Sequence, residues 1–102
     1  MESLNIDSMK MIKALCDDNR LKILEQLKSG EKCACTLNGS LPIKQSTLSH
    51  HMKILVESNL VNVRKDQVWA YYSLSENGTT YIKDYLTNLL TKNKNAIDSC
   101  SC

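Results

Sequence analysis

The sequence predicts a mainly α-helical domain that carries one β-hairpin, an α+β fold. Three observations predict it. Apolar residues recur at helical spacing through the first half of the chain, the pattern switches to a period of two over residues 61–74, and a broad helical stripe follows. With 102 residues, the chain has the size of a single domain. Its 42% apolar and 24% charged residues are typical of a globular protein.

Three helices are expected before the middle of the chain. Apolar residues at helical spacing predict the first over residues 5–16. Asp17 belongs to the residue types that cap helix N-termini, and the second helix continues from it to Gly30. A short third helix is expected around residues 35–38. Short connections between these helices are typical of a helical domain without a linker.

The strongest helix signal begins at Gln45 or Ser46. Leu48, Met52 and Leu55 recur at i, i+4 and i+7, which places them on one face of a helix that ends near residue 59. This face is expected to be buried. The remaining faces carry polar residues and are expected to meet solvent or a ligand.

A β-hairpin and a final helix follow. Apolar and polar residues alternate in residues 61–64 and 68–74, and residues 65–67 join the two runs. Trp69, Tyr71 and Tyr72 are expected to pack this hairpin against the helices, since large aromatic side chains contribute most when buried. A wide apolar stripe then predicts a helix over residues 76–92.

Several classes of protein are disfavoured by the composition. No apolar run approaches the roughly 20 residues that cross a bilayer, and the N-terminus lacks the pattern of a secretory signal. We therefore expect a cytoplasmic protein without a membrane partner. Five cysteines, an odd number, do not indicate a disulfide framework. In a reducing compartment they favour metal binding, redox sensing or simple burial.

Positive charge is concentrated in one part of the chain. The net charge is only +2, yet residues 44–65 alone carry four basic residues against one acidic residue. This stretch spans the strongest helix and the start of the hairpin. Helices followed by a hairpin form the layout of a winged helix-turn-helix, and a polyanion such as DNA is the partner that this charge predicts.

The outward face of the strongest helix is suited to a DNA groove. At about 100° per residue, small hydroxyls, a histidine and a lysine project away from the buried face. Such side chains can bond base edges and phosphates in the major groove. The alternative is an ordinary solvated surface. His51 borders the buried face, which favours a structural role. The candidate DNA-binding residues are Gln45, Ser46, Thr47, Ser49, His50 and Lys53 on the helix, with Arg64 and Lys65 on the hairpin.

Three stretches, in order, resemble the ArsR/SmtB family of metal-responsive repressors, closest to its arsenic-responsive type. Residues 15–24 (LCDDNRLKIL) resemble the second-helix signature, residues 45–55 (QSTLSHHMKIL) the recognition helix, and residues 68–74 (VWAYYSL) the second wing strand. The resemblance covers about residues 9–90. It implies a homodimer, joined through its terminal helices, that represses transcription and leaves its double-stranded operator DNA when an inducer binds. Residues 1–95 would then form the winged-helix DNA-binding and dimerisation domain, and residues 96–102 a polar tail that contains cysteines.

Cys33 and Cys35 are the candidate metal ligands. Thiolates are preferred by soft ions. On a regular helix, side chains two residues apart point in different directions, so sharing an ion requires that the helix start be loosened into a turn. Lys32 and a helix N-terminus are expected to lower the thiol pKa values. The alternative is that both cysteines are small buried side chains.

A third ligand is not evident from the sequence. The resemblance points to arsenite or antimonite, As(III) or Sb(III), as the inducer with no permanently bound cofactor. The arsenic-responsive type generally has a third cysteine where this chain has Asn38. Cys16, Cys100, Cys102 or a small-molecule thiol could replace it. Cys16 is expected to be a core residue. Residues 76–95 contain no histidine, which disfavours a zinc site on the last helix.

Three other hypotheses remain open. One is a repressor of the same fold that senses redox state or persulfides through its thiols. Another is response to a different soft metal, such as cadmium or lead. A third, of another class, is a small cytosolic metal-binding module. An enzyme is not expected, because the sequence has no nucleophile–base pair and no phosphate-binding loop.

Overall fold

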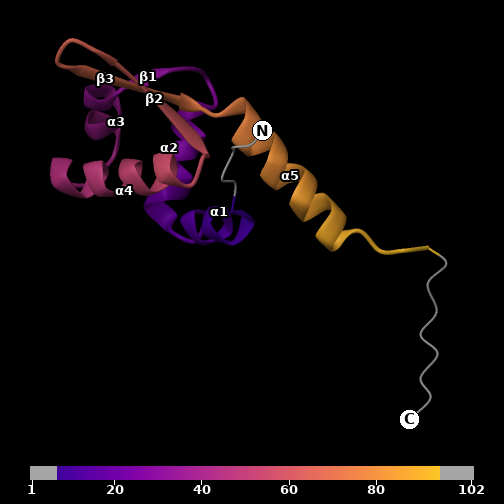
Figure 1. Cartoon of the computed structure of the whole chain (residues 1–102). Helices are drawn as coiled ribbons and strands as arrows, with labels where there is room; N and C mark the ends of the chain where they lie inside the picture. The colour runs from indigo at the N-terminus through magenta and orange to yellow at the C-terminus, as the bar shows by residue number, and fades with distance from the viewer. Residues whose placement is uncertain (1–6, 95–102) are drawn as a thin grey trace.

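The computed structural model describes residues 7–94, and within them the predicted order of helices, hairpin and helix is confirmed (Figure 1). The helices are α1 (Ser8–Ala14), α2 (Asp18–Leu27), α3 (Ala34–Ser40), α4 (Gln45–Glu57) and α5 (Glu76–Leu90). The strands are β1 (Lys32–Cys33), β2 (Val61–Asp66) and β3 (Trp69–Leu74). Hairpin β2–β3 runs back above α4 in this view, with α3 between them, and α5 runs outward from the rest of the fold (Figure 1).

Side-chain caps define where the first two helices begin. Asp7 Oδ1 accepts hydrogen bonds from the backbone N–H groups of Met9 and Lys10, at 3.1 and 3.3 Å. Helix α1 is therefore shorter than the expected span of residues 5–16, of which residues 5 and 6 lie outside the described residues. Asp17 caps α2 as predicted, because its Oδ2 accepts from the Arg20 N–H at 3.0 Å.

One hydrophobic core joins the helices to the base of the hairpin. The predicted apolar face of α4 is buried, with Leu48, Met52 and Leu55 at most 3% exposed. Because this face is anchored in the core, the opposite face of α4 is directed to solvent. The buried apolar residues are Met11, Ala14, Ile23, Leu27, Leu37, Leu41, Leu48, Met52, Leu55, Leu60, Val61 and Ile82.

The sheet contains a strand that the periodicity did not predict. Strand β1 pairs antiparallel with β3, giving the order β1–β3–β2, and Cys33 lies opposite Tyr71. A two-residue strand is too short to show a period of two. The hairpin loop is also tighter than expected. Lys65 and Asp66 still pair with β3, and Gln67 turns the chain with a φ of 60°.

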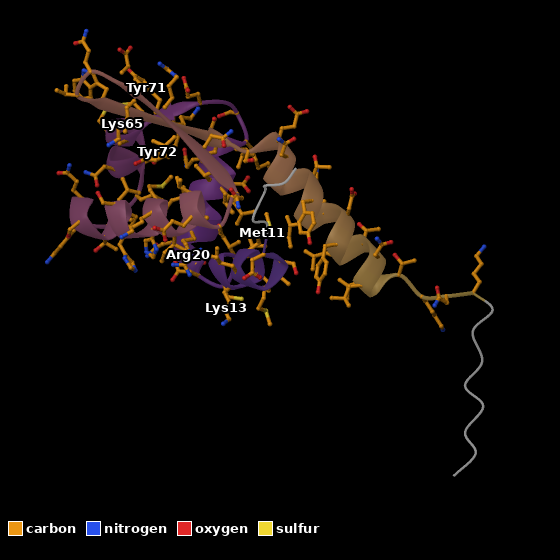
Figure 2. All side chains as sticks on the ribbon, viewed as in Figure 1. Met11, Lys13, Arg20, Lys65, Tyr71 and Tyr72 are labelled. Carbon is orange, nitrogen blue, oxygen red and sulfur yellow. The ribbon has the colours of Figure 1, made fainter. Side chains whose placement is uncertain are left out.

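The expectation for the hairpin aromatics is correct only for Tyr72, which packs partly buried against the core. Trp69 is 52% exposed, and its neighbour Val68 is 87% exposed. Tyr71 is half-buried and lies under the guanidinium of Arg64, at 4.5 Å from ring centre to Cζ. Val68 and Trp69 are at the turn that joins β2 to β3, whereas Tyr71 lies further along β3, opposite Arg64. Tyr71 and Tyr72 are labelled in Figure 2.

Helix α5 is fixed at its start by close packing against the end of α4. Ser75 caps α5 through a 3.0 Å bond from the Gly78 N–H, and the Ser75 N–H donates to the Leu60 carbonyl. A Cβ at Gly78 would lie 1.6 Å from the carbonyl oxygen of Asn59, so only glycine fits. Within residues 7–94, none of the helices has both the length and the apolar character needed to span a membrane.

Candidate DNA-binding surface and thiol site

The predicted recognition face of α4 is open to solvent. Gln45, Ser46, Ser49, His50 and Lys53 are exposed. Thr47, which the helical spacing placed at the flank, is half-buried. Since the opposite side of α4 is held in the core, one polar face of the helix is presented as a unit.

His51 has a structural environment, in agreement with the expectation from its position. Its side chain is 9% exposed, Nδ1 accepts from Arg20 Nη1 at 3.1 Å, and Nε2 lies 3.8 Å from Asp17 Oδ2. Arg20 Nε also donates to the carbonyl of Ala14 at 2.7 Å. Arg20 lies between α1 and α4 (Figure 2). Through these contacts, His51 in the middle of α4 is linked to the start of α2 and, by way of Arg20, to the end of α1.

On the hairpin, Arg64 and Lys65 are both exposed but differ in their partners. Arg64 Nε and Nη2 donate to the two carboxylate oxygens of Glu31, at 3.1 and 2.8 Å. This pairing raises the pKa of Arg64 and lowers that of Glu31. Lys65 lies further along the same strand (Figure 2). Sequence reasoning did not single out Glu31, because it is 33 residues from its partner.

Cys33 and Cys35 lie at the junction of β1 and α3 with their sulfur atoms 2.8 Å apart. Cys33 is the N-cap of α3 and has an extended backbone, so the two side chains do not diverge as they would inside a helix. Its Sγ accepts from the Cys35 N–H at 3.4 Å. Cys35 is exposed and Cys33 partly so. Both sulfurs can therefore reach one ion.

The two thiols differ in acidity. The pKa of Cys33 lies below its ordinary value, first because the Cys35 thiol donates to its sulfur, and then because the backbone N–H groups of Cys35 and Thr36 face it. The same contact raises the pKa of Cys35. The predicted contribution of the helix start is present. The predicted contribution of Lys32 is not, since Lys32 Nζ donates instead to Ser29 Oγ at 2.9 Å.

The other cysteines do not complete this pair within the described residues. Cys16 was expected in the core but is exposed, and its Sγ donates to the carbonyl of Ile12 at 3.3 Å. It directly follows Leu15, the C-cap at which α1 ends. Cys100 and Cys102 lie outside the described residues. Across residues 7–94, no three His, Cys, Asp or Glu side chains gather closely enough to hold a metal ion.

A groove connects the thiol site to the recognition helix and the hairpin. Cys35 and Asn38 line it from α3, Gln45 and Ser49 from α4, and Trp69 from β3. The side-chain oxygen of Asn38 is buried and has no hydrogen-bond partner among the described residues. The sequence marked position 38 only as the place of an absent third cysteine. It did not predict the groove, because the groove is lined by three separate elements.

An exposed polar recognition helix followed by a hairpin wing defines a winged helix-turn-helix transcriptional regulator. Residues 17–63 match the family described as "Bacterial regulatory protein, arsR family". The chain is also 39% identical over 90% of its length to the arsenical resistance operon repressor of Staphylococcus xylosus, of which the match covers 85%. The chain belongs to the ArsR family. The predictions of a regulator of the repressor type, and of a protein that is not an enzyme, are confirmed.

Further relatives and solved structures agree with this assignment. The arsenical resistance operon repressor of Staphylococcus aureus is 43% identical over 78% of this chain and 73% of its own length. A crystal structure titled as a possible transcriptional regulator for arsenical resistance superimposes with a TM-score of 0.75 at 25% identity, covering 81% of this chain and 86% of that one. The structure of HlyU from Vibrio cholerae superimposes with a TM-score of 0.67 at 30% identity, and the match covers 83% of this chain and 92% of that one. The winged-helix fold class is thereby confirmed.

Proposed function

We propose that this chain is a homodimeric repressor that binds operator DNA and releases it when arsenite or antimonite binds Cys33 and Cys35. It acts in the cytoplasm, where DNA is present and thiols stay reduced, and it needs no permanently bound cofactor. The proposed DNA-binding and dimerisation domain spans residues 1–95, and the proposed tail, residues 96–102, lies outside the described residues. The observation that carries the proposal is the 2.8 Å separation of the two sulfur atoms.

The thiol pair has the chemistry that a trivalent arsenic or antimony ion requires. Soft ions select thiolates over oxygen and nitrogen ligands. Cys33 is the more acidic thiol and therefore the first to bond, and Cys35 lies within reach of the same ion. The names of the staphylococcal relatives, arsenical resistance operon repressors, support this class of inducer.

The position of the pair explains how binding would reach the DNA-binding face. Cys33 Sγ caps α3 by accepting from the Cys35 N–H, and an ion on that sulfur competes with the cap. Cys33 also belongs to β1, which pairs with β3 of the hairpin. A shift at Cys33 would therefore alter both α3, which lines a groove with α4, and the base of the wing.

A second copy of the chain is the proposed occupant of the apolar face of α5. Tyr81, Tyr85, Leu89 and Leu90 are 37–78% exposed along this helix, and Met9 of α1 is 58% exposed. Helices α1 and α5 contact each other, so these residues belong to one region of the surface. An apolar region of this kind on two terminal helices is suited to an interface between identical subunits.

The central experiment measures release of operator DNA without oxygen, with a phosphine reductant that does not compete as a thiol. Arsenite and antimonite should release the DNA at lower concentrations than cadmium or lead. Cys33→Ser and Cys35→Ser should bind DNA normally and no longer respond, whereas Cys16→Ser should respond like the wild type. If peroxide or polysulfide releases the DNA and arsenite does not, the protein is instead a thiol-redox or persulfide sensor.

The DNA-binding face is tested by the dependence of affinity on salt. Lys53→Ala should weaken binding to operator and unrelated DNA alike. The salt dependence of the affinity should then correspond to about one fewer counterion released for each subunit. The control is Lys10→Ala, which removes the same charge at an exposed position of α1 instead of on the recognition helix. Equal effects of the two variants, or none, would favour a small metal-binding module over a repressor.

A further inference from the structure

We infer that arsenic is held at this site by two thiolates and one hydroxyl group, and that the side-chain oxygen of Asn38 accepts the hydrogen bond of that hydroxyl. The inference rests on the proposed function, because it concerns the same thiol site. It names the bound species and the residue that selects it. A third cysteine ligand is then not required.

The first observation is an acceptor without a donor. Asn38 Oδ1 is buried, and no group in the described part of the chain donates to it. Nearly all buried polar atoms in native proteins have a hydrogen-bond partner, so an exception calls for an explanation. A ligand that carries a donor at this point would satisfy the oxygen.

The second observation is the position of Asn38 relative to the thiols. It lies three residues after Cys35 on α3, and side chains at that spacing share one face of a helix. Cys35 and Asn38 also line the same groove. An ion bonded to Cys35 therefore has the Asn38 side chain as its neighbour along the helix.

The chemistry of arsenous acid supplies the missing donor. As(OH)₃ condenses with two thiols to form two As–S bonds, and two molecules of water leave. Arsenic remains trivalent, so no oxidant or reductant takes part. The third As–OH group is retained and has one O–H to donate. An amide oxygen is a poor direct ligand for a soft ion but a good acceptor for this hydroxyl.

X-ray absorption at the arsenic edge tests the ligand set directly. The full-length, reduced protein is loaded with arsenite in the absence of other thiols. Two As–S distances and one As–O distance are expected, and the triple variant Cys16→Ser/Cys100→Ser/Cys102→Ser should give the same spectrum. Three As–S distances in the wild type would overturn the inference, and their loss in the triple variant would identify a cysteine as the third ligand.

Direct binding measurements test the role of Asn38. Asn38→Ala should weaken arsenite binding roughly 3- to 10-fold, the effect of losing one neutral hydrogen bond. Phenylarsine oxide has no hydroxyl left once it has bonded two thiols, so its affinity should not change. Asn62→Ala, at an exposed asparagine of β2, is the matched control and should affect neither ligand. Equal arsenite affinity in Asn38→Ala and the wild type would overturn the inference.

A gain-of-ligand variant separates this inference from the proposed function. Asn38→Cys should convert the spectrum to three As–S distances and tighten arsenite binding. If arsenite releases DNA from the wild type, but both Asn38 variants bind arsenite with the affinity of the wild type, only the role of Asn38 is wrong. If arsenite neither binds nor releases DNA, the proposed function itself fails.

Discussion

Arg64 of the wing and Glu31 beside the thiol site form a two-point ion pair, with N–O distances of 3.1 and 2.8 Å. Glu31 directly precedes β1, which contains Cys33, and Arg64 lies over Tyr71, the residue opposite Cys33 in the sheet. A residue expected to contact DNA phosphate is therefore already bound by a carboxylate of its own chain. If Arg64 contacts phosphate as proposed, DNA must compete with Glu31 for its guanidinium group.

Glu31→Gln should raise the affinity for DNA, because Arg64 loses its nearest carboxylate and keeps only the more distant one of Asp66, at 4.0 Å. The increase should be largest at low salt, and the salt dependence should become steeper. Glu76→Gln, at an exposed position in the first turn of α5 and outside residues 44–65, makes the same change of charge and controls for net charge. Fluorescence anisotropy over a range of salt concentrations measures both. Equal behaviour of the two variants would show that Arg64 does not contact phosphate.

Gly78→Ala should destabilise the fold by about 3 kcal/mol, as expected for a group forced into a packed site. The added Cβ would lie 1.6 Å from the Asn59 carbonyl oxygen, so the start of α5 must move. Gly39→Ala is the matched control within α3, where a Cβ meets nothing within 4 Å. It should stabilise by about 0.5–1 kcal/mol. Urea unfolding at one pH compares them, and a neutral Gly78→Ala would contradict the packing.

Asp17 should make stability depend on pH in the acidic range. Its folded-state pKa lies below the ordinary value of 3.8, mainly because the backbone N–H of Arg20 donates to the carboxylate. Partial burial of the carboxylate raises the pKa by a smaller amount. The stabilisation is complete above the unfolded pKa and is lost as the pH falls through the lower folded value. Thermal unfolding between pH 2.5 and 6 measures it.

The matched variant for this prediction is Asp17→Asn, which keeps a capping oxygen and removes the charge. Its deficit in stability relative to the wild type should be constant near neutral pH and shrink as the pH falls below about 4. A deficit that does not change with pH would mean that the carboxylate acts only as a cap.

Leu89→Asp should shift the protein from dimer to monomer, because it places a charge in the proposed apolar interface of α5. Leu89 is 62% exposed, so the fold of a single subunit should tolerate the change. Asn88→Asp adds the same charge one residue away on the helix and is the control. Sedimentation velocity measures the result. A wild type that sediments as a monomer, or a Leu89→Asp variant that remains a dimer, would contradict this interface.

Local patterns were sufficient to predict most of the fold. The cap at Asp17, the buried face of α4 and the hairpin each depend on residues within a few positions of one another. Periodicity reports such neighbours directly. It could not indicate β1, because two residues have no period, nor the exposure of Trp69, which depends on how the hairpin packs on the helices.

The candidate site divides in the same way. The sequence by itself determined which cysteines to consider and which face of α4 is polar, since both follow from residue type and helical spacing. Only the tertiary structure decided that Glu31 binds Arg64, that Cys16 is exposed, and that the side-chain oxygen of Asn38 is buried with no partner in residues 7–94. Burial, exposure and the Arg64–Glu31 pair all depend on how elements distant in sequence pack together, and spacing along the chain carries no information about that packing.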